Sequence, residues 1–152
     1  MGAVAKIRVV GSAAVAMQVG REALTEDIDA LYGSSPQVKA AVENIAQARN
    51  WPPTWLNDAV KMYVSHYITD EDWDLRIEEE EVMVFAARNE LLLAMKLKSG
   101  RGRRDQGDLD RLFEACRITS VADAEGIFDR YYPQDVIAAP ARRQLEARFP
   151  AS

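Results

Sequence analysis

The chain lacks the features that mark several special classes of protein. Its single cysteine, Cys116, excludes an internal disulfide framework, and no spacing of cysteine and histidine indicates structural zinc. No apolar run approaches the roughly 18 residues of a membrane-spanning helix. Residues 1–7 lack the basic start and continuous apolar core of a signal peptide. We therefore expect a protein of the reducing cytoplasm without a membrane partner.

Positive charge is also scarce. The 19 lysines and arginines are outnumbered by 24 aspartates and glutamates, giving a net charge of −5, which excludes a broad basic surface for nucleic acid. A local basic segment remains at residues 100–104, where Arg101, Arg103 and Arg104 either contact a polyanionic acceptor or only keep the loop solvated. The length of 152 residues, 48% of them hydrophobic, predicts a single globular domain over residues 1–152.

The first half of the chain has the patterns of a strand–helix–strand unit. The β-branched residues 7–10 end at a Gly-Ser turn and predict a strand, residues 13–19 a short helix, and residues 24–31 a second strand. Ser35 followed by Pro36 predicts the start of a helix that runs to about residue 49. The apolar spacing over residues 56–63 favours a third helix, whereas residues 68–81 are polar and ambiguous.

The second half is expected to be mainly helical. Residues 82–86 are apolar enough for a buried strand, and helices are predicted over 90–99, 109–116, 120–131 and 141–149. We expect an α+β, two-layer fold with a small mixed sheet of at least three strands. Residues 1–99 would form the sheet-containing core and residues 100–152 the helical C-terminal part.

Two aspartates on the second predicted strand are candidates for metal binding. Asp27 and Asp29 are two residues apart, so on a strand they present their carboxylates on the same side. Mg²⁺ prefers such oxygens together with substrate phosphates, which suits phosphoryl or nucleotidyl transfer. Alternatively, both carboxylates are solvated at a sheet edge. The turn Gly11-Ser12, between a strand and a helix, offers backbone N–H groups and the positive end of a helix dipole for a phosphate.

Residues 11–20 and 24–31 together resemble the opening of the nucleotidyltransferase superfamily. More closely, they resemble the branch with the bacterial abortive-infection (AbiEii-type) toxins and related uncharacterised nucleotidyltransferase-like proteins of the DUF6036 type. In that family a Gly-Gly or Gly-Ser turn binds nucleotide phosphate and an Asp-x-Asp strand binds the metal. Residues 91–97 and 103–109 resemble the family's later lysine-bearing helix and Arg-Asp-x-x-Asp segment. Residues 55–57 and 130–133 resemble one uncharacterised subfamily.

The resemblance implies a set of site residues. Mg²⁺ or Mn²⁺ would be bound by Asp27 and Asp29. The implied catalytic residues are Asp27, Asp29, Lys96, Asp105 and Asp108, and the implied nucleotide-binding residues are Gly11, Ser12, Thr25, Lys96 and Arg104. From the residues alone, Lys96 equally fits a lysine that extends along an apolar face to solvent. Asp105 and Asp108 equally fit carboxylates that stabilise a helix N-terminus.

We therefore expect a Mg²⁺-dependent nucleotidyltransferase that transfers a nucleotide from an NTP to tRNA or to a protein. The resemblance also implies a toxin–antitoxin or phage-defence setting with a cognate partner. The alternative is a catalytically inactive relative that serves as a binding or regulatory, antitoxin-like protein. Two departures from the family favour the alternative. Relatives carry an arginine between the Gly-Ser turn and the Asp-x-Asp strand, but here that region reads Arg21-Glu22-Ala23-Leu24, and Arg21 is not an evident substitute. The predicted strand at 82–86 also lacks the third carboxylate that many family members have.

Overall fold

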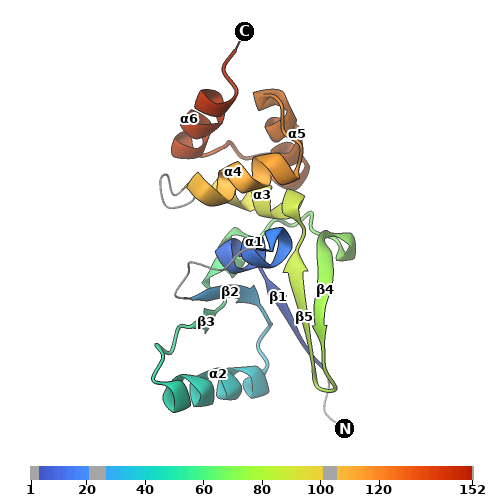
Figure 1. Ribbon diagram of the computed structural model, residues 1–152. Helices are drawn as coiled ribbons and strands as arrows, with labels where there is room; N and C mark the ends of the chain where they lie inside the picture. The colour runs from blue at the N-terminus through green and yellow to red at the C-terminus, as the bar shows by residue number, and fades with distance from the viewer. Residues whose placement is uncertain (1–3, 21–26, 101–105, 152) are drawn as a thin grey trace. The chain divides into compact units, whose positions relative to one another are not determined.

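The computed structural model describes residues 4–20, 27–100 and 106–151 (Figure 1). The chain forms two compact units that alternate along the sequence. The first, which we call the sheet unit, comprises residues 1–62 and 73–87. The second, the helical unit, comprises residues 63–72 and 88–152. The single-domain organisation expected from the sequence stays a prediction.

The sheet unit is built on five strands in the order β3-β2-β1-β5-β4. Strand β1 (Ala5–Val9) lies between β2 (Ile28–Leu31), with which it is antiparallel, and β5 (Val82–Ala87), with which it is parallel. The two-residue β3 (Leu56–Asn57) runs parallel to β2, and β4 (Trp73–Glu78) is antiparallel to β5. This mixed sheet with packed helices confirms the predicted α+β class and nucleotidyltransferase-type architecture.

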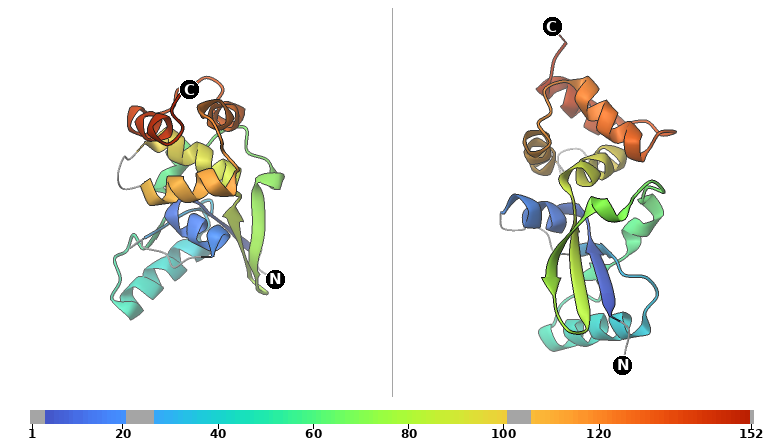
Figure 2. Two further views of the ribbon diagram at one scale, coloured as in Figure 1. Left: turned by 45° about the horizontal axis from the view of Figure 1, so that its top comes forward. Right: turned by 90° about the vertical axis from the view of Figure 1, so that its right-hand side faces the viewer.

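Helix α1 (Gly11–Val19) follows β1 directly and lies against one side of the sheet (Figure 2). Four consecutive residues of this helix, 13–16, are buried, so it is apolar all round rather than amphipathic. Its C-terminal half is fixed by Gln18, whose Nε2 donates to Asp74 Oδ2 at 3.0 Å and to the carbonyl of Ala87 at 2.9 Å. These bonds hold α1 against β4 and β5, which positions the Gly-Ser turn at the other end of the helix.

Helix α2 (Pro36–Arg49) begins as the sequence predicts. The Ser35 side chain accepts a hydrogen bond from the Val38 backbone N–H at 3.4 Å, and Pro36 occupies the first helical position, where its missing N–H costs nothing. The indole of Trp55 donates to the carbonyl of Val42 at 2.9 Å. This bond ties α2 to the segment that enters β3.

The prediction of one helix over residues 56–63 is wrong. Leu56 and Asn57 form β3, and a 3₁₀ helix, η1, follows at Ala59–Tyr63. Leu56 is 7% exposed because it pairs beside Ile28 of β2, and this partner is distant in sequence. The ambiguous segment 68–81 contains a 3₁₀ turn, η2 (Asp70–Asp72), and all of β4. Of the strand expected over 24–31, residues 24–26 lie outside the described residues and Asp27 is a bend before β2.

The helical unit contains α3 (Asn89–Ser99), α4 (Gln106–Ala115), α5 (Val121–Tyr131) and α6 (Ala139–Arg148). Helix α3 is the centre of this unit and contacts the other three helices. The largest buried side chains around it are Phe113 and Phe128, both at most 2% exposed. Helix α5 has the predicted cap: the Ser120 Oγ accepts from the Asp123 N–H at 3.1 Å. Within the described ranges, none of the helices is long and apolar enough to cross a membrane.

The segment 63–72 is bound to the end of α5, so residues 130–133 (Arg-Tyr-Tyr-Pro) have a structural role. The Tyr131 hydroxyl donates to Asp72 Oδ1 at 2.5 Å, and the Tyr132 hydroxyl donates to the carbonyl of Tyr63 at 2.9 Å. Burial, together with the hydrogen bond to Asp72, raises the pKa of Tyr131 to about 12. The phenol therefore stays protonated near neutral pH and serves as a donor.

Two glycines of the helical unit are expected to respond oppositely to alanine. Gly100 has φ +56°, and a Cβ there would lie 2.1 Å from the Cβ of Ala138, so Gly100→Ala should lower the free energy of unfolding by about 2–4 kcal/mol. Gly126, inside α5, meets nothing within 4 Å, so Gly126→Ala should raise it by about 0.5–1 kcal/mol. Urea denaturation followed by circular dichroism measures both. Equal effects of the two substitutions would contradict the close approach of Gly100 to Ala138.

Candidate functional site

The Gly-Ser turn and the second aspartate meet in the sheet unit. Gly11 begins α1 with φ +66°, a left-handed conformation that favours glycine. A Cβ built on Gly11 would lie 3.1 Å from Oδ2 of Asp29, so the carboxylate of Asp29 lies directly against the glycine backbone. The backbone reinforces this arrangement, because the Val10 N–H donates to the carbonyl of Asp29 at 2.9 Å. A helix N-terminus and a half-buried carboxylate therefore share one small region.

Asp27 and Ser12 belong to the same region of the chain. Asp27 comes immediately before β2, and Ser12 is the second residue of α1. Both side chains are half-buried, and both have interactions within the protein. Thr25, which the sequence also assigned to nucleotide binding, and Arg21, the candidate for the missing family arginine, lie outside the described residues.

The position beside Asp29 on the neighbouring strand is occupied by an amide. In the parallel pair of β2 and β3, Asp29 is the register partner of Asn57. The Asn57 side chain holds its own turn: Nδ2 donates to the carbonyl of Thr54 at 3.1 Å, and Oδ1 accepts from the Ala59 N–H at 3.2 Å. The sequence predicts a later strand only over residues 82–86, which lie in β5, but β5 is not next to β2, whereas β3 is. Only the sheet order reveals Asn57 as this neighbour.

The carboxylates of Asp27 and Asp29 suit a divalent cation that the protein binds weakly and that substrate phosphates help to hold. Among the described residues, no group of three or more His, Cys, Asp or Glu side chains could hold a metal ion. Mg²⁺ does not need such a cage, because it keeps several waters and commonly binds through one or two carboxylates together with substrate phosphates. Asp29, placed at the N-terminal end of α1, fits that requirement, and Asp27 is the second candidate ligand.

Lys96 and Asp108 form a buried ion pair in the helical unit. Lys96 Nζ lies 3.2 Å from Asp108 Oδ2, and the two side chains are 4% and 5% exposed. Lys96 comes from α3 and Asp108 from the first turn of α4. The lysine therefore does not extend to solvent, and Asp108 does more than stabilise a helix end. Two further candidates of this group, Arg104 and Asp105, lie outside the described residues.

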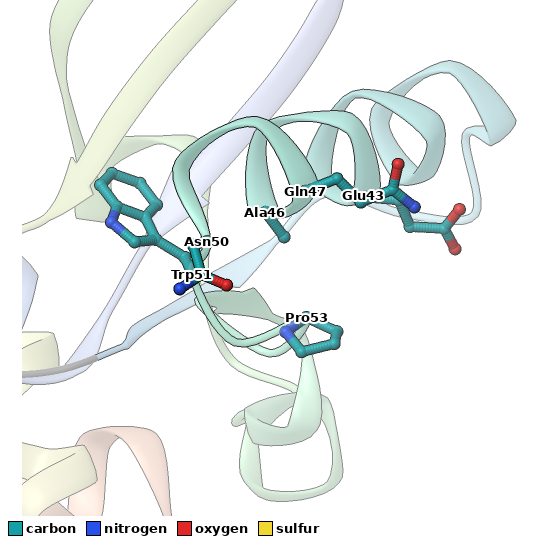
Figure 3. A pocket seen from close by; sticks show the side chains of 6 residues that line it. All are labelled: Glu43, Ala46, Gln47, Asn50, Trp51 and Pro53. Carbon is teal, nitrogen blue, oxygen red and sulfur yellow. The ribbon is translucent and has the colours of Figure 1, made fainter.

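A surface concavity of about 460 Å³ lies along α2 in the sheet unit (Figure 3). The residues that line it come from α2, from the C-terminal cap of this helix and from the segment that follows: Glu43, Ala46, Gln47, Asn50, Trp51 and Pro53. Asn50 ends the helix with φ 55°, which turns the chain toward Trp51 and Pro53. Of the predicted nucleotide-site residues that the structure describes, none lines this concavity.

The mixed sheet, the left-handed glycine at the start of α1 and the carboxylate against it define a nucleotidyltransferase-type α+β protein. The chain belongs to a family described as nucleotidyltransferases of unknown function (DUF6036), whose sequence profile matches residues 3–142. No curated protein and no solved structure matches the chain. The family assignment confirms the nucleotidyltransferase resemblance; the narrower AbiEii-type relationship stays a prediction.

Proposed function

We propose that this protein is a Mg²⁺- or Mn²⁺-dependent enzyme that transfers a nucleotide from an NTP to a hydroxyl of RNA, such as tRNA, or of a protein. The observation that supports the proposal most directly is the contact of the Asp29 carboxylate with the Gly11 backbone at the N-terminus of α1. This arrangement sets the N–H groups of a helix N-terminus, which suit a phosphate, beside a carboxylate oxygen, which suits a divalent cation. Membership of the nucleotidyltransferase family supports the same reaction class.

In the proposed reaction, the backbone around Gly11 and Ser12 holds the triphosphate, while Asp27 and Asp29 hold the cation. The cation supplies charge neutralisation at the phosphates. The acceptor hydroxyl oxygen forms a bond to the α-phosphorus, and the bond from that phosphorus to the bridging oxygen breaks. Pyrophosphate leaves with the bonding electron pair, and the hydroxyl proton passes to a carboxylate or to water. Lys96, Thr25, Arg104, Asp105 and Asp108 keep their predicted roles from the resemblance to the family.

Label transfer tests the proposal. The protein is incubated with each of the four α-³²P-labelled NTPs, Mg²⁺ and either total tRNA or a protein extract, and acceptors are separated on denaturing gels. We expect label in one acceptor class with wild type, and none with the Asp27→Ala/Asp29→Ala double variant or with EDTA. No transfer by wild type, together with no Mg²⁺-dependent nucleotide binding, would reject the enzyme. The identity of the acceptor would also address the proposed toxin–antitoxin or phage-defence role.

A second candidate function is a binding or regulatory protein that keeps the fold without catalysis. The observation that favours it is Asn57, an amide in the register position beside Asp29. Nucleotide binding measured by calorimetry separates the two candidates. Binding that requires Mg²⁺ and Asp29, without transfer to any acceptor, would favour the regulatory protein.

A further inference from the structure

Strand β4 forms an edge of the five-stranded sheet. The strand order ends at β4, whose neighbour in the described part of the chain is β5 (Figures 1 and 2). One side of an edge strand presents backbone N–H and C=O groups that an added strand can pair with. Natural proteins usually protect such edges with charged side chains, proline or bulges. The residues along β4 therefore indicate whether its edge can accept an added strand.

The protection of β4 is incomplete. Leu75 is 44% exposed and Ile77 is 47% exposed. A register shift between them makes Leu75 the partner of Phe85 and Ile77 the partner of Val84, so the two side chains lie on opposite faces of the sheet. Arg76 is the only basic residue of the strand, and its Nη2 donates to the carbonyl of Met17 at 3.1 Å. The one residue suited to repel another strand by positive charge is thus bound to α1.

The charge of this hairpin defines what could pair with it. Residues 73–81 contain five acidic residues and one basic residue. The four glutamates 78–81, the first of which is the last residue of β4, are all exposed. A second copy of the chain would bring the same acidic hairpin and a net charge of −5. Self-pairing would therefore set carboxylates near carboxylates, whereas a basic strand would be attracted.

We propose that β4 and the glutamates 78–81 form a docking surface for an extended, basic segment of a partner polypeptide. The segment adds a strand beside β4 through backbone hydrogen bonds. Its aliphatic side chains cover Leu75 and Ile77, and its lysines or arginines face the glutamates. The bulge between Leu75 and Ile77 limits the added strand to a short one. This inference does not depend on the proposed transferase activity.

A fluorescein-labelled peptide that repeats Val-Val-Lys-Lys, and so places valines on both faces of a strand, tests the proposal by fluorescence anisotropy with the full-length protein. We expect wild type to bind it and Leu75→Gln/Ile77→Gln to weaken binding at least about tenfold, because the apolar contact is lost without a change of charge. Replacing all four glutamates by glutamine should weaken binding and flatten its salt dependence. Ile45→Gln, a comparably exposed aliphatic position on α2 (38%), is the matched control and should bind as wild type does.

A second peptide with the same lysines separated by glycine and serine distinguishes strand pairing from general attraction. Equal binding of the two peptides, or no binding of the valine–lysine peptide by wild type, would overturn the proposal. So would an equal loss of binding in Ile45→Gln. Sedimentation velocity tests the other occupant: a wild-type dimer that Leu75→Gln/Ile77→Gln dissociates would identify a second copy instead. Thermal melts confirm that each variant is folded, and shifts of β4 amide resonances on adding peptide would locate the contact.

Discussion

Replacing Lys96 by methionine is expected to lower the free energy of unfolding of the helical unit by about 3–5 kcal/mol. The substitution nearly keeps the length and volume of the side chain but removes the positive charge that lies 3.2 Å from the carboxylate of Asp108, which is 5% exposed. Removing one partner of a buried ion pair is costly because the protein interior solvates the remaining charge poorly. Urea denaturation with wild type and Lys96→Met measures the difference.

Two further variants identify the cause of that loss. In Lys96→Met/Asp108→Leu both charges are gone, so most of the lost stability should return. Lys98→Met is the matched control on the same helix: its pair with Asp135 spans 3.3 Å, but the side chains are 31% and 43% exposed. Water screens that pair, so the change should stay within about 1 kcal/mol. A double variant as unstable as Lys96→Met would show that the buried charge is not the reason.

The same double variant separates structural from catalytic roles of the pair. If Lys96 and Asp108 only hold α3 to α4, the stable double variant should retain nucleotidyl transfer. If Lys96 also offsets phosphate charge, as the family resemblance implies, the double variant should be folded and lose transfer. Restored stability with lost transfer would therefore assign the pair to the reaction.

Replacing Asp29 by asparagine is expected to slow Mg²⁺-dependent nucleotidyl transfer at least about 100-fold. The amide preserves the shape that lies against Gly11 but removes the negative charge that Mg²⁺ requires. Single-turnover label transfer at saturating NTP measures the effect. Asp58→Asn is the matched control, because Asp58 belongs to the sheet unit and pairs with the exposed Lys61 at 3.4 Å. It should transfer at the wild-type rate, and an Asp29→Asn variant as active as wild type would refute the metal-binding role.

A change at Gly11 should act on the same carboxylate without altering its charge. Gly11→Ala forces a Cβ to within 3.1 Å of Asp29 Oδ2 at a positive φ, so we expect Mg²⁺-dependent nucleotide binding to weaken about tenfold or more. Gly20→Ala is matched, since Gly20 ends the same helix with φ +71° and an added Cβ there meets no described residue within 4 Å. Gly20→Ala therefore introduces the strain of a positive φ without a contact to Asp29. Equal loss of nucleotide binding in both variants would show that strain, not contact with Asp29, is responsible.

Local patterns were enough to predict those elements whose signals lie within a few residues. Ser35 with Pro36, and Ser120 with Asp123, carry the chemistry of helix starts in their own side chains, and the structure has helices beginning there. The apolar run 82–86 favours a strand by its composition, and in β5 residues 82–85 are half-buried and Ala86 is buried. The motif residues Gly11 and Asp29 meet because consecutive elements of the chain tend to lie side by side.

Patterns failed where distant partners decided the structure. Leu56, Ala59 and Tyr63 have helical spacing, yet Leu56 pairs with β2, and a sheet hydrogen bond to a remote strand outweighs a weak local preference. The segment 73–78 alternates Trp73, Leu75 and Ile77 with polar residues, but the acidic residues around it obscure this signal, and its pairing with β5 shows that it is a strand. The sequence likewise gave no means to pair Lys96 with Asp108, since each alone has a common structural explanation.

The sequence by itself therefore determined the class of the protein: an α+β chain with a Gly-Ser turn, an Asp-x-Asp motif and a nucleotidyltransferase-like order of motifs. The tertiary structure alone decided three things. It set the Asp29 carboxylate against Gly11, placed Asn57 rather than a carboxylate beside Asp29, and buried Lys96 with Asp108. The physical reason is that burial and strand register depend on contacts between residues far apart in the chain, which local periodicity does not encode.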